Sequence, residues 1–163
     1  MILALSRTTH GAQNAVVHEL EDGSTLVWEL IDEEPADALL AARVEAVRPG
    51  WLMRHDRVDF PPGGVAYRHT HPGPGIRYLL HGRLRIESAG ENHAYGPGEA
   101  WFESGPEPVL ATASESEETA FVRVLLLPPE WAGRRTIRYV DPADEDRPKL
   151  QRATVFGEYP VAF

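Results

Sequence analysis

The sequence predicts an all-β domain, a sandwich or barrel built from many short strands. Gly and Pro, 14 of each, are spread along the chain and form turn signals at short intervals. Between residues 50 and 108 the pieces that separate these turns are about 5–10 residues long, which suits strands rather than helices. The segments with a clear hydrophobic pattern also have the period of strands, and together these observations set the fold class.

Two segments show the strand pattern most clearly. Leu84 and Ile86 alternate with charged residues, which predicts a strand with one buried face. Residues 121–127 form a near-continuous apolar run, which predicts a strand buried on both faces. Residues 137–139 repeat the alternation more briefly. We expect residues 50–128 to form most of a barrel core.

Two flanks surround this core, and we expect the whole chain, 1–163, to form a single domain. In the N-terminal flank, 1–49, residues 15–20 and 25–30 can pair as a hairpin around Asp22-Gly23. Residues 35–47 have apolar side chains at roughly helical spacing, so this flank is expected to be partly helical or irregular. The C-terminal arm, 141–163, ends in an apolar stretch that should pack on the barrel or on a second subunit.

Charge and composition exclude several classes of function. The chain has 16 Lys plus Arg and 25 Asp plus Glu, a formal net charge of −9, which argues against binding nucleic acid or an anionic membrane. Cys is absent, so neither a disulfide framework nor a thiolate nucleophile is available. No apolar run approaches the ~18 residues of a membrane span, and no basic segment precedes the short apolar N-terminus. We expect a soluble, cytoplasmic protein.

His69 and His71 are the residues best placed to carry chemistry. Side chains two apart on a strand lie on the same face, with Cα atoms about 6.6 Å apart, so the two imidazoles can converge on one cation. Neutral imidazole is a ligand for Zn, Cu, Fe and Ni. The alternative is a pair that faces solvent or lines a cavity without a metal.

The segment around this pair resembles the first motif of the cupin superfamily. Gly63, His69, His71 and Gly82 keep the spacing of that motif, and residues 95–102 resemble the opening of the second motif. The resemblance implies a jelly-roll β-barrel of two antiparallel sheets with a cavity at one mouth. It also implies a divalent metal ion such as Zn, Fe, Mn or Ni, and a homodimer.

The chain departs from the family pattern at the metal ligands. Gly75 stands where the family has its glutamate ligand, and Val109 stands where the second motif has its histidine. Only His69 and His71 remain as metal ligands, whereas catalytic zinc sites generally use three protein ligands. The resemblance therefore supports the fold better than it supports the metal.

Strand parity places further side chains in the same interior. Tyr67 shares the face of the histidine pair, and Arg77 and His81 share the face of position 75. Trp101 and Glu103, beside the incomplete second motif, are expected to line the cavity as well. An interior Arg77 repels a dication and favours a carboxylate or phosphate, unless it is neutralised by Glu103.

Two hypotheses of different classes follow. The first is a small-molecule-binding protein with a cavity suited to an organic anion and no competent catalytic metal. The second is a divalent-metal enzyme, a dioxygenase or an isomerase, that uses His69, His71 and a substitute carboxylate such as Glu103. Some epimerase relatives within the superfamily use a histidine base without metal, so a metal-free enzyme is a variant of the second hypothesis.

Overall fold

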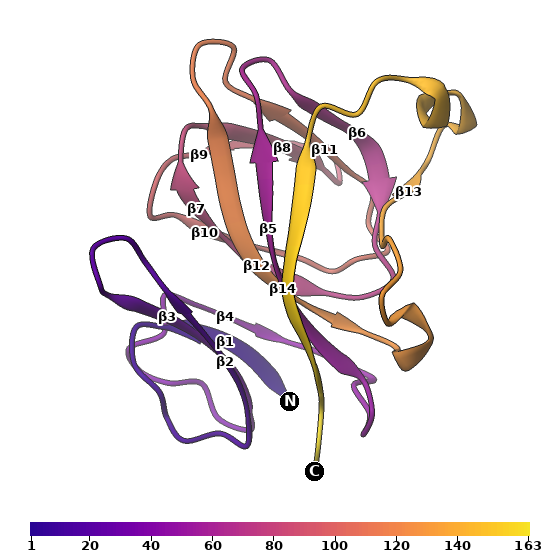
Figure 1. The fold of residues 1–163 in the computed structure, drawn as a ribbon. Helices are drawn as coiled ribbons and strands as arrows, with labels where there is room; N and C mark the ends of the chain where they lie inside the picture. Colours follow the sequence, from indigo (N-terminus) through magenta and orange to yellow (C-terminus); the bar gives the residue numbers. More distant parts are fainter.

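The computed structural model describes residues 1–163 as three antiparallel sheets (Figure 1). The first, N-terminal sheet has the strand order β2-β3-β1-β4, the second β10-β7-β12-β5-β14, and the third β13-β6-β11-β8-β9. The second and third sheets remain two separate sheets rather than one closed barrel, an arrangement that fits the expected jelly roll. The prediction of an all-β, cupin-type fold is confirmed.

The first sheet contains β1 (Ile2–Ser6), β2 (Asn14–Glu19), β3 (Thr25–Ile31) and β4 (Leu40–Arg43). The expected hairpin is present, because β2 pairs with β3 across its whole length. The expected helix over 35–47 is wrong: β4 pairs with the free edge of β1 instead. The helical spacing there was supported by few apolar side chains, and backbone pairing with a neighbouring edge outweighs such a weak local preference.

The second sheet contains β5 (Leu52–Phe60), β7 (Gly75–His81), β10 (Ala100–Glu103), β12 (Thr119–Leu127) and β14 (Arg152–Pro160). β12 lies at its centre and is buried at all nine positions, as its continuous apolar run predicts. The C-terminal arm joins this sheet, since β14 pairs with β5 and becomes one edge.

The third sheet contains β6 (Val65–Thr70), β8 (Leu84–Ser88), β9 (Glu91–Tyr95), β11 (Val109–Ala113) and β13 (Arg138–Tyr139). β8 has the predicted alternation, with Leu84 and Ile86 buried and Arg85 exposed. Two short 3₁₀ turns, η1 (Pro129–Trp131) and η2 (Pro142–Asp146), are the helical elements. Neither is long or apolar enough to cross a membrane.

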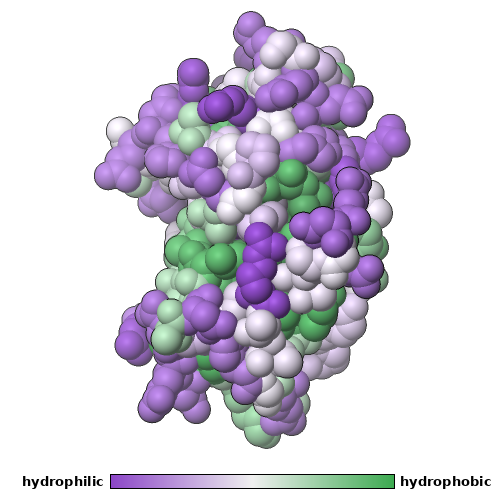
Figure 2. All heavy atoms as spheres, turned by 90° about the vertical axis from the view of Figure 1, so that its left-hand side faces the viewer, coloured by the Kyte–Doolittle hydropathy of each residue, from purple (hydrophilic) through white to green (hydrophobic).

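The core has two main parts, one on each face of the second sheet, and a small third cluster of Leu52, Leu125 and Leu127. Val122, Val124 and Leu126 of β12 pack against the first sheet around Trp28. Phe121 packs on the other face, in a cluster that the second and third sheets share. On the face shown in Figure 2, hydrophobic side chains gather at mid-height, where the first sheet meets the second, and hydrophilic ones cover both ends. The second sheet is therefore a middle layer, and only its face toward the third sheet is available to a cavity.

Candidate functional site

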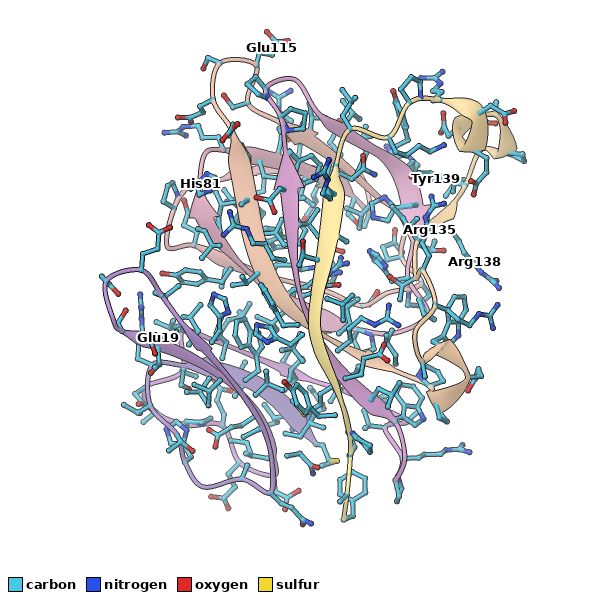
Figure 3. All side chains as sticks on the ribbon, in the orientation of Figure 1. Glu19, His81, Glu115, Arg135, Arg138 and Tyr139 are labelled. Carbon is cyan, nitrogen blue, oxygen red and sulfur yellow. The ribbon has the colours of Figure 1, made fainter.

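A cavity of about 710 Å³ lies between the second and third sheets. Its inner wall comes from β5, β7, β10 and β12 of the second sheet and from β6, β8 and β11 of the third. Its outer part is lined by β14, by β13 and by the connecting segment 133–151, which lie beside one another at the edges of the two sheets (Figures 1 and 3). The volume falls in the range of small-molecule sites, about 300–1,000 Å³.

His69 and His71 both line this cavity from β6 and its end. Their ring centroids are 4.9 Å apart, with one ring edge-on to the other. The Nδ1 of His69 donates to the backbone oxygen of Tyr67 at 2.6 Å, and the Nδ1 of His71 lies 3.1 Å from the Oγ1 of Thr136. A carbonyl oxygen only accepts, so a neutral His69 carries its proton on Nδ1 and leaves Nε2 as an acceptor.

Both imidazoles are held in the neutral form. Burial lowers the pKa of His69, and burial together with the charges of Arg123 and Arg77 lowers the pKa of His71 well below its usual value. Neither Nε2 has a hydrogen-bond partner in the protein. His69 can therefore accept a hydrogen bond, or a proton, at Nε2 from a molecule in the cavity, whereas the Nε2 of His71 donates or accepts according to the direction of its bond with Thr136.

The expectation for Tyr67 is wrong, because Ala66 lines the cavity in its place. The register between β6 and β11 shifts between the pairs Ala66–Ala111 and His69–Val109, and such a bulge turns the strand by one residue. The Tyr67 side chain instead carries the guanidinium of Arg147 over its ring, 5.0 Å from the centroid.

Arg77 and Glu103 line the cavity from the neighbouring strands β7 and β10 and form a buried ion pair. The Nη2 of Arg77 lies 2.7 Å from the Oε2 of Glu103, but its N–H groups are not aligned with a hydrogen-bond acceptor. The other nitrogen, Nη1, donates to the backbone oxygen of Gly75 at 2.7 Å. Burial lowers the pKa of Arg77 to about 10, so the guanidinium stays charged at neutral pH.

Trp101 supports this pair without lining the cavity itself. It is buried, stacks on Tyr95 with ring centroids 4.7 Å apart, and donates from Nε1 to the Oε1 of Glu103 at 2.9 Å. Both oxygens of Glu103 are thus engaged. The expectation that Trp101 lines the cavity is wrong, because the ring lies in the core between the sheets.

His81 also lies outside the cavity. It is exposed at the end of β7, where its ring contacts the backbone oxygen of Glu118 and the guanidinium of Arg57 (Figure 3). The register between β7 and β12 shifts between Ala120 and Phe121, so the alternation that turns Arg77 inward does not continue to His81.

Two further interior ion pairs were not anticipated. Arg123 binds Asp56 in a bidentate pair, with Nε–Oδ1 at 2.7 Å and Nη2–Oδ2 at 3.1 Å. Arg54 lies 2.6 Å from the Oε1 of Glu158 on β14. A charged residue within the apolar run of β12 was the available signal for Arg123, since such a residue has to face something polar.

The mouth of the cavity is lined by basic side chains that the sequence reading also missed. Arg135 and Lys149 lie over the ring of Tyr139, at 5.5 and 4.8 Å from its centroid. Arg134 and Arg147 lie nearby on the same segment, over Trp131 and Tyr67. Nothing in a polar, irregular stretch marks these residues as neighbours, because their proximity depends on the path of the loop.

The comparisons with known proteins bear on the same part of the chain. Residues 56–109, which include His69, His71, Arg77 and Glu103, match the family model for the cupin domain. The match covers about a third of the chain, and this part is similar to a cupin domain. A search of curated proteins found no match.

Solved structures similar to this chain include several from bacteria. The polyketide cyclase RemF from Streptomyces resistomycificus is 24% identical, with a TM-score of 0.45, over 54% of this chain and 61% of that one. KdgF from a Halomonas species is 25% identical, with a TM-score of 0.42, over 54% of this chain and 79% of that one. An RmlC-like cupin from Shewanella frigidimarina is 15% identical, with a TM-score of 0.42, over 54% and 86%.

The residues of this site do not fit the metal that the family pattern implies. No three His, Cys, Asp or Glu side chains are grouped so that they could hold a metal ion. A Cβ atom at Gly75 would lie 2.5 Å from the backbone oxygen of Val124, so this position has no room for the family's glutamate. Glu103 cannot serve as a substitute while Arg77 and Trp101 hold its two oxygens. Two imidazoles beside two guanidinium groups form a poor site for a dication.

Proposed function

We propose that this protein binds a small organic anion in the cavity between its second and third sheets. The size of the cavity supports this proposal, as does its mixed lining. The wall between the sheets is apolar and can take the body of a ligand; it consists of Val58, Phe60, Ala66, Ile86, Val109, Ala111 and Phe121. The polar side chains are gathered around the histidine pair and at the mouth.

The observation that carries the proposal is the sign of the charge in the cavity. Seven of its lining residues are Arg or Lys and four are Asp or Glu, in a chain whose formal net charge is −9. The cavity therefore concentrates positive charge within an acidic protein. A cleft lined by one sign of charge focuses the field and raises the local concentration of ligands of the opposite sign.

A matched pair of ligands tests the proposal. We expect 2-naphthoate to bind about tenfold more tightly than the isosteric, uncharged 2-naphthamide in calorimetric titrations at low salt. Raising the salt to about 0.5 M should reduce the difference, because exposed charges are screened within a few ångströms. Equal affinities for the two ligands, or no heat from either, would count against an anion site.

We also propose that the protein works as a cytoplasmic homodimer that associates through β14. This strand forms an edge of the second sheet, and Val155, Phe156 and Tyr159 are 52%, 48% and 47% exposed. An edge strand with apolar side chains is a template for pairing with another chain. A second copy of the same chain is the simplest partner for this edge, because most soluble oligomers consist of identical subunits.

A further inference from the structure

The charged groups of the cavity fall into two sets that differ in how they are neutralised. Each interior arginine, Arg54, Arg77 or Arg123, has a carboxylate oxygen within 2.7 Å. These three cations and three carboxylates balance. A carboxylate of a ligand placed among them would face three like charges in a buried environment, which is costly.

Of the basic groups at the mouth, Arg147 has such a partner, with its Nε 3.1 Å from the Oδ1 of Asp144, whereas Arg135 and Lys149 do not. The closest carboxylate to Arg135 is that of Glu145 at 4.0 Å, and Lys149 bonds to a backbone oxygen rather than to a carboxylate. Both are held instead by the ring of Tyr139. A cation–π contact positions a charge without neutralising it, so these two cations remain available to an anion.

The polar atoms without hydrogen-bond partners mark the same two ends of the cavity. The chain has four buried side-chain atoms of this kind, and three of them belong to cavity-lining residues. The hydroxyl of Tyr139 and the Oε1 of Gln151 are at the mouth, and the Nη2 of Arg77 is at the inner end. Buried polar groups in folded proteins are almost always hydrogen-bonded, so the Tyr139 hydroxyl and the Oε1 of Gln151 point to a bound molecule, whereas the Nη2 of Arg77 already lies 2.7 Å from the Oε2 of Glu103.

The inner end offers a donor and an acceptor but no free charge. The acceptor is the Nε2 atom of the neutral His69, and the donor is Arg77. A hydroxyl group can donate to the imidazole and accept from the guanidinium, and a carbonyl can accept from the latter. An oxygen without charge is therefore the group that this end would recognise.

We propose that the ligand is an amphipathic anion that binds with its anionic group outward, at Arg135, Lys149 and the Tyr139 hydroxyl. Its apolar body lies along the wall between the sheets, and an uncharged oxygen, preferably a hydroxyl, reaches His69 and Arg77. This inference rests on the proposed function and adds the orientation of the ligand and the second polar group that it carries.

Variants of the mouth test the outward orientation. Figure 3 shows Arg135 and Tyr139 beside β13 and Arg138 directed away from the molecule. Arg138 lies over Trp131 and does not line the cavity, so Arg138→Gln is the matched control for Arg135→Gln and Lys149→Gln. The readout is the ratio of the affinities for 2-naphthoate and 2-naphthamide. We expect this ratio to fall about three- to fivefold in each mouth variant and roughly tenfold in the double variant, and to keep its wild-type value in Arg138→Gln.

A hydroxyl at the far end of the same probe tests the inner contact. We expect 6-hydroxy-2-naphthoate to bind about fivefold more tightly than 2-naphthoate, as one net hydrogen bond allows. The replacement His69→Phe should remove this advantage.

The outcomes separate the two proposals. If naphthoate is preferred over naphthamide but the ratio is the same in the mouth variants as in the wild type, the outward orientation is wrong and the anion site stands. If the hydroxyl gives no gain, the inner contact is wrong. If naphthoate is not preferred at all, the proposed function fails and the inference fails with it.

Discussion

At the residue scale, Gly75 shows how the local packing decides what the site can hold. A Cβ atom there would lie 2.5 Å from the backbone oxygen of Val124 and 2.8 Å from the Cδ2 of Leu125, so neither neighbour can yield cheaply. We expect Gly75→Ala to lower the free energy of unfolding by about 1–3 kcal/mol, as over-packing of a core does. Chemical denaturation with urea measures this difference.

The control for that variant is Gly96→Ala. A Cβ atom at Gly96 meets only the flexible carboxylate of Glu99, at 3.3 Å. Its unfolding free energy should stay within about 0.5 kcal/mol of the wild type. Equal stability of the Gly75 and Gly96 variants would show that the β7 backbone can move, and that a glutamate could then be accommodated at position 75.

Single residues were predictable where a strand is regular and unpredictable where it is not. The spacing of His69 and His71 was enough to place both rings in one cavity, and Arg77 followed from the alternation along its own strand, whereas Glu103 was expected from its place beside the incomplete second motif. Tyr67 and His81 were misplaced because each lies beside a register shift. A bulge adds one residue to one strand, and nothing in the sequence of that strand alone records it.

At the scale of elements, a histidine pair joins three strands on the face of the second sheet that is turned toward the first sheet. The Nε2 of His55 on β5 lies 3.1 Å from the Nδ1 of His18 on β2, and Phe156 of β14 covers both rings. Burial, with the neighbouring His18 charge, lowers the pKa of His55 to about 4. Burial lowers the pKa of His18 as well.

This pair predicts a loss of stability in mild acid. The unfolded chain binds a proton at His55 near pH 6.5 and the folded protein only near pH 4, so stability decreases as the pH falls through this window. Between pH 7.5 and pH 5 we expect His55 to account for about 2 kcal/mol. The variant His55→Gln keeps a polar side chain, and between the same two pH values it should lose about 2 kcal/mol less unfolding free energy than the wild type.

The comparison uses urea unfolding at both pH values. His93→Gln is the control, because the His93 side chain is 61% exposed and remote from the pair. The pKa values of His69 and His71 are lowered too, so the wild type and both variants share the loss of stability in acid that these two histidines cause. Only the difference in unfolding free energy between His55→Gln and the wild type is due to His55. If His55→Gln and the wild type lose the same unfolding free energy between the two pH values, the prediction is wrong.

Elements with a strict period were predictable, whereas elements defined by their partners were not. β8 and β12 follow from hydrophobic alternation and from a continuous apolar run. β4 does not, because four residues acquire strand geometry only from the edge of β1. The segment 133–151 has no period beyond the brief alternation at 137–139, although it supplies most of the cavity mouth.

At the scale of the molecule, the central sheet determines both the site and the available surfaces. One face is covered by the first sheet, and the other face forms the cavity. The edge at β14 remains open, and its apolar side chains continue the surface around the mouth of the cavity. A second copy on this edge would bury that surface and extend the wall beside the mouth.

Association through the β14 edge can be tested by the mass of the protein in solution. Size-exclusion chromatography with light scattering should give about twice the 18.1 kDa of one chain. Tyr159→Lys places a charge on the exposed part of β14 and should shift the protein to a monomer, because a lysine on an edge strand opposes pairing with another strand. Leu39→Lys replaces a side chain of similar exposure, 44%, outside β14 and should leave the dimer intact. A monomeric wild type at micromolar concentration would refute the association, and a dimeric Tyr159→Lys variant would place the interface elsewhere.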